Sequence, residues 1–406
     1  MIKAVARVYS CLTNYEKAYI IKSVMKRIYL DHAATTPLDQ RVFEKMAPYF
    51  MENFGNADSP HALGRKAMSA VDFARDQVSE LIHAAKNEVY FTSGGTEADN
   101  WAVIGAANAQ AKCGKSKVIV SSIEHHAVLY AAEKLKNDGF EICYLPVNEG
   151  GRVEINALEE VIDEQTALVA VMAVNNETGV LQPIKALAEI AHAHGALFFT
   201  DAVQAAPYLP IDVKEWGVDL LSFSAHKFYG PKGVGALYIK NGVKIEKHVG
   251  GGEQERGLRG GTLNVPSVVG FAAAYQKCVE EREENNQKIQ TLANAFMQEL
   301  SILDGIQRNG DKNNALDGVL NLQIDGVENT SLLFKMDLQG VCMAAGSACA
   351  SASIKPSHVL TAMGLSEKQA QSSVRISFGK NNELSEVIDA AKIFVQTIER
   401  LRKKDK

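Results

Sequence analysis

Short apolar runs alternate with stretches of helical periodicity through the middle of this chain, and this alternation limits its fold more than any other feature. Seven runs have the length of strands: Val89–Thr92, Lys117–Ser121, Glu141–Leu145, Leu168–Val174, Leu197–Thr200, Leu220–Ser224 and Ala236–Ile239. Four stretches of helical spacing lie between them: Glu97–Gln110, Ala127–Asn137, Ile155–Ile162 and Ile184–His194. Strands that alternate with helices predict an α/β fold with a mainly parallel sheet.

The pattern changes after about residue 265. A long helical stretch runs from Pro266 to Leu300 through EEREENNQK, a charge cluster that is typical of a solvated helix face. Strand-like VLNLQI (Val319–Ile324) and VRISF (Val374–Phe378) follow, separated by helical segments. This part of the chain predicts a smaller α+β domain with an antiparallel sheet.

Composition excludes several classes of protein. The formal net charge of −5 argues against a dedicated nucleic-acid binder, which usually carries a strongly basic domain. The longest clean apolar run, Ala167 to Val174, is much shorter than the roughly 18 residues of a membrane helix. The six cysteines form no C-x-x-C pair, so zinc ribbons, thioredoxin-type sites and ferredoxin-type clusters lack their spacing. Scattered cysteines fit a reducing cytoplasm.

Residues 1–27 differ from the rest of the chain in charge. They hold six Lys or Arg and one Glu, a net +5 against −10 for residues 28–406. The segment has neither the uninterrupted apolar stretch nor the cleavage site of a secretion signal. We expect residues 1–24 to be a dispensable extension, with Met25 as an alternative start.

Polar residues follow several of the predicted strands, at the sheet edge where ligands bind in open parallel sheets. VYFT is followed by SGGTEADN, in which the backbone N–H groups of Gly95 and Thr96 at a helix N-terminus suit a phosphate; the alternative is a tight turn that needs glycine. ALVAVMAV ends at Asn175 and Asn176, which either face a ligand or form a turn.

Two further strand ends carry charged groups. Asp201 directly follows a buried run, where a carboxylate needs a partner such as a cationic ligand nitrogen; the alternative is a helix N-cap. Lys227, beside His226, ends another run and suits an amine nucleophile; the alternative is a surface lysine in a Gly-rich loop. His125 also follows a strand, where an imidazole is able to stack on a ring and move protons.

Together these groups describe the needs of one cofactor. Pyridoxal phosphate requires a phosphate cradle, a lysine for its aldehyde, an acid for its pyridine nitrogen and a flat group over its ring. The chain contains neither G-x-x-x-x-G-K-[ST] nor a G-x-G-x-x-G after a strand, so the competing phosphate motifs are absent.

Nine motifs then identify a family resemblance. They are YLDHAATTPL, TSGGTEADN, EHHAVL, VNNETGVLQPI, TDAVQA, SAHKFYGPKGVGALY, ERGLRGGT, GSACASAS and SSVRISFG. In this order, over roughly residues 28–400, they resemble a cysteine desulfurase, a class V, pyridoxal-phosphate-dependent enzyme of iron–sulfur cluster assembly and tRNA thiolation. The resemblance implies a fold-type I transferase with a seven-stranded sheet, divided into an extension (1–27), a large cofactor-binding domain (37–282) and a small domain (28–36 with 283–406).

The resemblance also implies a role for each matching residue. Those expected at the cofactor are Lys227 as the Schiff-base lysine, His125 over the ring, Asp201 at the pyridinium nitrogen, Gln204 and Asn176 near the hydroxyl, and Gly95, Thr96, Ser224 and His226 at the phosphate. Thr262 resembles a residue lent to the neighbouring subunit's phosphate, which implies a homodimer. Arg375 matches the arginine that grips the substrate carboxylate, a contact for which a guanidinium fork is suited, and Asn176 is also expected at the substrate.

Cys349 matches the nucleophile of the family. It lies among small residues, AAGSACASAS, which bury little apolar surface, and this setting is similar to the longer catalytic loop of one branch of the family. The implied reaction converts L-cysteine to L-alanine and leaves a persulfide on Cys349, with Lys227 and His125 moving protons. The sulfur then passes to an acceptor protein, a cluster scaffold or a tRNA-thiolating enzyme. No metal is expected in the chain alone, although Cys349 would be a shared cluster ligand in a scaffold complex.

Other interpretations stay open. A different class V enzyme, a selenocysteine lyase or an aminotransferase, shares Lys227, Asp201 and His125 but does not need Cys349. A sulfur carrier without catalysis would lack the cofactor. Cys342 is interpreted as structural, and His192 and His194 as solvated residues at a helix end rather than metal ligands.

Overall fold

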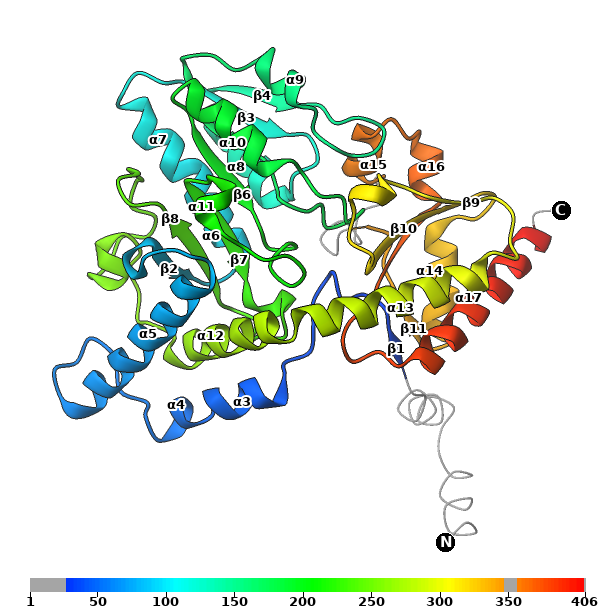
Figure 1. The fold of residues 1–406 in the computed structure, drawn as a ribbon, viewed down its shortest axis with the longest axis horizontal. Coiled ribbons are helices and arrows are strands. Elements are labelled where there is room, and N and C mark those ends of the chain that lie inside the picture. Colours follow the sequence, from blue (N-terminus) through cyan, green and yellow to red (C-terminus); the bar gives the residue numbers. More distant parts are fainter. Residues whose placement is uncertain (1–26, 347–355, 405–406) are drawn as a thin grey trace, which may run out of the picture.

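A seven-stranded sheet forms the centre of the larger part of the molecule (Figure 1). The computed structural model describes residues 27–346 and 356–404 of the 406-residue chain. The strand order is β2-β8-β7-β6-β5-β3-β4, and only β8 runs antiparallel to its neighbours. The strands are β2 (Val89–Thr92), β3 (Lys117–Ser121), β4 (Glu141–Leu145), β5 (Thr166–Ala170), β6 (Leu197–Asp201), β7 (Leu220–Ser224) and β8 (Gly235–Ile239). The predicted α/β fold with a mainly parallel sheet is confirmed.

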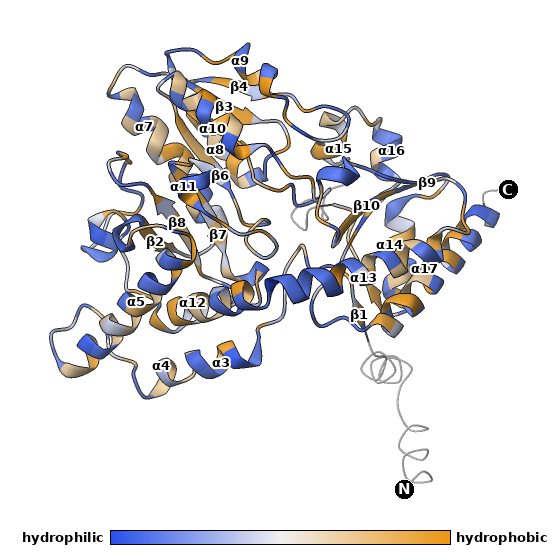
Figure 2. Ribbon diagram, viewed as in Figure 1, coloured by the Kyte–Doolittle hydropathy of each residue, from blue (hydrophilic) through white to orange (hydrophobic). Residues whose placement is uncertain are grey.

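Helices cover both faces of this sheet, which explains why its strands are apolar runs rather than alternating ones. Adjacent residues of β6 enter opposite cores: Phe198 packs toward one face and Phe199 toward the other, and both are fully buried. Each such ring contributes roughly 2–3 kcal/mol of burial. One core contains α5 (Ala62–Leu81), α10 (Ile184–Ala193) and α12 (Val265–Glu280); the other contains α6 (Gly95–Asn100), α7 (Ala106–Ala111) and α8 (His126–Asn137). Figure 2 shows the strands between them coloured as hydrophobic.

Short helices complete this part of the fold. They are α3 (Gln40–Met46), α4 (Pro48–Met51), α9 (Ile155–Glu159) and α11 (Val213–Trp216). Asp39 caps α3 by accepting a hydrogen bond from the backbone of Arg41 at 3.0 Å, and α3 packs against α12. Within the residues that the structure describes, no helix is long and apolar enough to cross a membrane.

A second, smaller unit has its own core. Its three-stranded antiparallel sheet has the order β12-β10-β9, and a two-stranded parallel sheet joins β1 to β11. The elements are β1 (Ile28–Tyr29), β9 (Ile306–Arg308), β10 (Val319–Ile324), β11 (Val341–Cys342), β12 (Ser373–Ser377), α13 (Arg282–Leu300), α14 (Asn329–Leu338), α15 (His358–Ala362), α16 (Glu367–Gln371) and α17 (Leu384–Lys404). The core includes Leu30, α13 and α17. This separate core supports the division into a large domain (37–282) and a small domain (28–36 with 283–406), which we keep as a proposal.

The helical stretch predicted from Pro266 to Leu300 is two helices. α12 ends at Glu280, and Glu281 leaves helical geometry with φ −99° and ψ 3° before α13 begins. α12 packs on α5 of the large domain, whereas α13 packs on α17 of the small domain. The first turns of α13 are hydrophilic in Figure 2, and Glu283 and Glu284 are exposed, so the predicted solvated face is confirmed.

Candidate active site

The carboxyl ends of the central strands surround one cavity of about 190 Å³. Ten of the residues predicted for the site line it: Gly95, Thr96, His125, Asn176, Asp201, Gln204, Ser224, His226, Lys227 and Arg375. Ala33, Ala34, Asp99, Met172 and Val203 complete the lining. All but the two alanines and Arg375 come from the large domain, so the cavity lies between the two units.

One end of the cavity is built to accept an anion. Gly95 begins α6 and lies beside Ser224, the last residue of β7. A Cβ on Gly95 would lie 2.9 Å from Cγ2 of Val203, so this position excludes larger side chains. His226 Nδ1 lies 3.1 Å from the Thr35 hydroxyl, and burial lowers the pKa of His226 to about 4.

Two buried acids also line the cavity. Asp201 ends β6 and accepts a hydrogen bond from the Val203 N–H at 2.8 Å; burial raises its pKa to about 6. Asp99 accepts a hydrogen bond from the Ser222 hydroxyl, and complete burial raises its pKa well above the usual range. Sequence reasoning missed Asp99, because the polar segment GTEADN gives no sign that this acid alone among its charged residues is fully buried.

Lys227 and His125 both line the cavity, close enough for the Lys227 charge to affect the pKa of His125. The Lys227 ammonium donates hydrogen bonds to the carbonyl oxygens of Ala33 at 2.5 Å and Ala34 at 3.0 Å. His125 is the N-cap of α8, where its Nδ1 accepts from the Ala127 N–H at 3.2 Å. Burial, with the nearby Lys227 charge, lowers the pKa of His125 to about 4. Its ring is therefore neutral at pH 7 and able to accept a proton.

Arg375 enters the cavity from β12 of the small domain and is almost completely buried. Its Nη2 donates to Asp31 Oδ1 at 2.7 Å, and its Nη1 donates to the Asn176 carbonyl at 2.9 Å. Nε has no hydrogen-bond partner in the described part of the chain. Asp31 was not predicted as a site residue, although it lies within the motif YLDHAATTPL.

Other predicted residues lie elsewhere. Thr262 is exposed and does not line the cavity of its own chain, and Cys349 falls outside the described residues. His192 is exposed in the last turn of α10, as predicted for a solvated helix end, and its Nε2 also lies 2.7 Å from Asp219 Oδ2. Cys342 is in β11, with its Sγ 3.8 Å from Arg27 Nη1. Across residues 27–346 and 356–404, no cluster of three metal-ligating side chains occurs.

The cavity fits pyridoxal phosphate on independent grounds. Gln204 Oε1 is buried without a hydrogen-bond partner among the described residues, as expected of a group that awaits a ligand. The Asp201 carboxylate is buried at a strand end, where a cationic ring nitrogen would compensate its desolvation. Gly95 lines the cavity with backbone alone, because a Cβ there would lie 2.9 Å from Val203 Cγ2.

Comparison with known proteins agrees with this geometry. The family model Aminotransferase class-V matches residues 28–389. A putative cysteine desulfurase IscS 1 of Bacillus subtilis is 48% identical over 93% of this chain and 100% of its own length, and a cysteine desulfurase IscS of Clostridium botulinum is 43% identical over 93% and 96%. A solved NifS-like protein has a TM-score of 0.86 at 36% identity and covers 92% of this chain and 99% of its own. A structure described as SspA in complex with cysteine has a TM-score of 0.77 at 34% identity, covering 86% and 98%.

The match spans both domains and every strand of the central sheet. The chain therefore belongs to the class V aminotransferase family and, within it, to the pyridoxal-phosphate-dependent cysteine desulfurases.

Proposed function

We propose that this chain converts L-cysteine to L-alanine and transfers the sulfur first to Cys349 as a persulfide and then to an acceptor protein. The observation that carries the proposal is the meeting of Lys227, Asp201 and Arg375 in one cavity, because these three supply an amine, a buried carboxylate and a carboxylate-binding fork. The relatives named cysteine desulfurase support the reaction, and the neighbour solved with cysteine supports the substrate. They do not favour a selenocysteine lyase or an aminotransferase.

The cofactor contacts follow from the lining of the cavity. Pyridoxal phosphate would be held at its phosphate by Gly95, Thr96, Ser224 and His226, at its ring nitrogen by Asp201, near its hydroxyl by Gln204 and Asn176, over its ring by His125, and at its aldehyde by Lys227. When bound, it supplies an electron sink for the bond that is broken next to the substrate amine.

Each remaining step uses groups of this chain. Arg375 binds the substrate carboxylate. Lys227 Nζ removes the proton from the substrate α-carbon and returns a proton at a later step. His125, which burial keeps neutral, accepts the proton of the substrate thiol.

Sulfur transfer needs Cys349 as a thiolate. Its Sγ forms a bond to the substrate sulfur while the carbon–sulfur bond breaks; the electron pair of that bond stays on the carbon side and is protonated, so that alanine leaves. The persulfide then passes to a cluster scaffold or a tRNA-thiolating enzyme. In a scaffold complex Cys349 would also be a shared iron–sulfur ligand.

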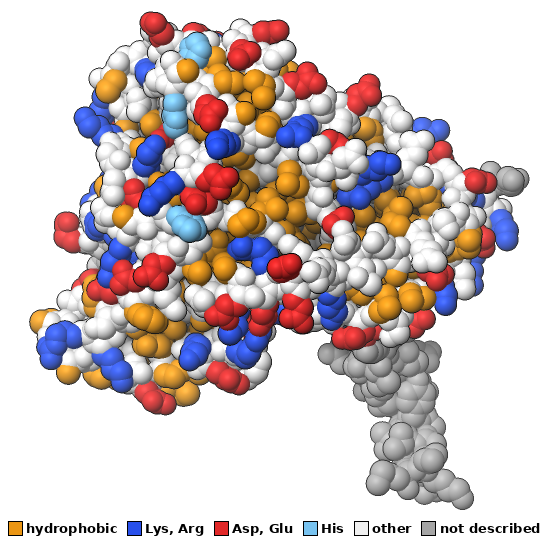
Figure 3. Space-filling view, viewed as in Figure 1, with side chains coloured by type: hydrophobic (Ala, Val, Ile, Leu, Met, Phe, Trp, Pro, Cys, Tyr) orange, Lys and Arg blue, Asp and Glu red, His pale blue; other side chains and the backbone are white. Residues whose placement is uncertain are grey.

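A homodimer completes this proposal. Large hydrophobic side chains are exposed over α3, α4 and α5, where Figure 3 shows hydrophobic atoms at the surface: Phe43, Phe50, Met51, Phe54, Leu63 and Phe73. Thr262 is exposed outside its own cavity, as expected of a residue that serves the neighbouring subunit. The cysteines among the described residues are free thiols, which suits a reducing cytoplasm.

The test is Cys349→Ser, with Cys342→Ser as the matched control. Cys349→Ser keeps the absorbance of the bound cofactor and loses sulfide release from L-cysteine, whereas Cys342→Ser keeps both. Unchanged sulfide release in Cys349→Ser would refute the desulfurase and favour another class V enzyme. Purified protein that binds no cofactor would instead indicate a sulfur carrier without catalysis.

A further inference from the structure

The backbone two residues after Lys227 adopts a conformation that tyrosine rarely takes. Tyr229 has φ +63°, in the left-handed region, where a Cβ crowds the neighbouring carbonyl. Such a residue persists only when its surroundings hold it from several sides, and strained backbone of this kind gathers at functional sites. The groups that hold Tyr229 in this conformation therefore also affect the position of Lys227, two residues earlier in the chain.

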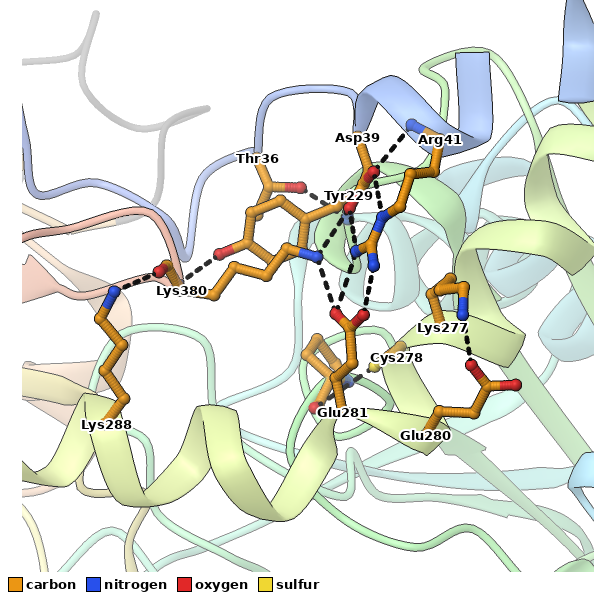
Figure 4. A network of polar contacts seen from close by, with 11 residues as sticks. Thr36, Asp39, Arg41, Tyr229, Lys277, Cys278, Glu280, Glu281, Lys288 and Lys380 are labelled. Atoms are coloured by element: carbon orange, nitrogen blue, oxygen red, sulfur yellow. Dashed lines mark hydrogen bonds and ion pairs between the residues drawn. The ribbon is translucent and has the colours of Figure 1, made fainter. Parts of the chain in front are cut away.

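Four contacts fix Tyr229 (Figure 4). Its N–H donates to the Thr36 hydroxyl at 2.8 Å, and its carbonyl accepts from the Asp39 N–H at 3.0 Å. Its own hydroxyl accepts from the Lys380 backbone N–H at 2.8 Å, and the Lys380 ammonium lies 4.6 Å from the centre of its ring. The backbone of Tyr229 is thus held by Thr36 and Asp39, and its hydroxyl and ring are held by the backbone and the ammonium of Lys380.

Lys380 belongs to the small domain and follows Arg375 by five residues. Its ammonium is largely buried and lies 2.8 Å from Asp39 Oδ2 and 3.2 Å from Glu281 Oε2. Arg41 contacts the same two carboxylates at 2.7 and 2.6 Å. Since Glu281 marks the junction between α12 and α13, this network joins the two domains at the point where the long helix is interrupted.

We propose that Tyr229 is a positioning residue for Lys227 and that Lys380 couples the position of Lys227 to that of the strand carrying Arg375. Lys380 touches Tyr229 with both its backbone and its ammonium, so a shift of the segment after β12 moves the turn after Lys227. The proposal rests on the proposed roles of Lys227 and Arg375. It adds that the contact between Lys380 and Tyr229, which lies outside the cavity, keeps Lys227 and Arg375 at a fixed distance from each other.

The test replaces the ammonium and keeps the backbone contact. Lys380→Met removes both ion pairs and the contact with the ring, and Lys380→Arg restores a cation. Lys277→Met is the matched control, because Lys277 makes a 2.6 Å ion pair with Glu280 in the same view without touching Tyr229. Tyr229→Phe removes only the hydroxyl contact and provides a second variant if Lys380→Met does not fold.

Amide hydrogen exchange measures the local stability of the turn around Tyr229 directly. The N–H groups of Phe228, Tyr229 and Gly230 are hydrogen-bonded, so their exchange is slow enough to follow. In Lys380→Met we expect their exchange to be about tenfold faster, since loss of one hydrogen bond to a charged group is worth at least that factor. Lys277→Met leaves it unchanged, Lys380→Arg recovers it, and Tyr229→Phe moves it in the same direction as Lys380→Met.

Steady-state kinetics measure how the same substitutions change the reaction. We expect kcat/KM for L-cysteine to fall about tenfold in Lys380→Met, to recover in Lys380→Arg and to stay unchanged in Lys277→Met. Unaltered exchange of the three amides in Lys380→Met, or a loss that Lys380→Arg does not recover, overturns the proposal. Exchange measured on the cofactor-free chain is independent of desulfurase activity, so an inactive wild-type enzyme with the expected exchange pattern would refute the function and leave the coupling standing.

Discussion

Replacing Arg375 by lysine tests the assignment of the substrate site most directly. The guanidinium is 1% exposed and already gives one nitrogen to Asp31 and another to the Asn176 carbonyl. A lysine retains the charge but has one nitrogen in place of a planar fork. It is therefore unable to keep both protein partners and still grip a carboxylate through two parallel bonds.

The size of the effect depends on the hydrogen bonds that a lysine does not make. A hydrogen bond to a charged group is worth about 1.5–3 kcal/mol, so the absence of one reduces kcat/KM for L-cysteine by about 10- to 150-fold. Arg375→Met should also destabilise the fold, because it leaves Asp31 without its cation; this cost lies near the lower end of about 3–5 kcal/mol, since the Asp31 side chain is 19% exposed. Adding Asp31→Asn to Arg375→Met should recover part of that stability.

The assay compares L-cysteine with 2-aminoethanethiol, which lacks the carboxylate. Sulfide release from both is measured with wild-type enzyme and with Arg375→Lys. We expect the substitution to reduce kcat/KM for L-cysteine and to leave the smaller activity on 2-aminoethanethiol unchanged. An equal loss on both compounds would show that Arg375 serves the fold or the cofactor rather than the substrate carboxylate.

Two further predictions follow from burial and exposure. Burial lowers the pKa of His32, His125 and His226 from 6.5 to about 4, so the unfolded chain binds protons before the folded one as pH falls from 6.5 toward 4. The free energy of unfolding therefore decreases by up to about 3 kcal/mol for each histidine over that pH range. Urea unfolding of the cofactor-free protein at pH 7 and pH 5 measures this decrease, and equal unfolding midpoints at the two pH values would contradict it. Phe50→Asp, on α4, should produce a monomer by light scattering, whereas Phe334→Asp, similarly exposed on α14, should not; a dimer in both would exclude the surface over α3 to α5 as the interface.

The central sheet was predictable because its strands are buried on both faces. Four of the seven have the predicted bounds, since an apolar run between turn residues has few other places to lie. β6 and β8 differ from their predicted bounds by one residue at one end. β5 differs most: the predicted run continues to Val174, but the strand ends at Ala170. The N–H of Met172 donates to Glu124 Oε1 at 2.6 Å, so a buried side chain takes the place of the next ladder partner.

The short strands of the small domain were missed. β1, β9 and β11 have two or three residues each, which is too few to show a period of two. Their pairing depends on tertiary contacts, since β1 joins β11 across some 310 residues of sequence. The break between α12 and α13 was missed for a related reason, because the residues on both sides have helical spacing and only the charged contacts of Glu281 mark the junction.

The sequence alone does not indicate which of the buried acids at the site carries the negative charge. Asp99 and Asp201 line the cavity, Glu124 is buried nearby next to His125, and burial raises the pKa of each of the three. The pKa of Glu124 rises to about 8, whereas that of Asp201 rises only to about 6, because the Val203 N–H and the Lys227 charge favour the ionised form of Asp201. Negative charge is therefore concentrated at the one carboxyl that ends β6. A cationic ring nitrogen in this cavity would meet the Asp201 carboxylate, because the Lys227 charge favours ionised Asp201 and the Asp201 charge in turn raises the pKa of Asp99 and Glu124. Only the folded chain brings these charges together.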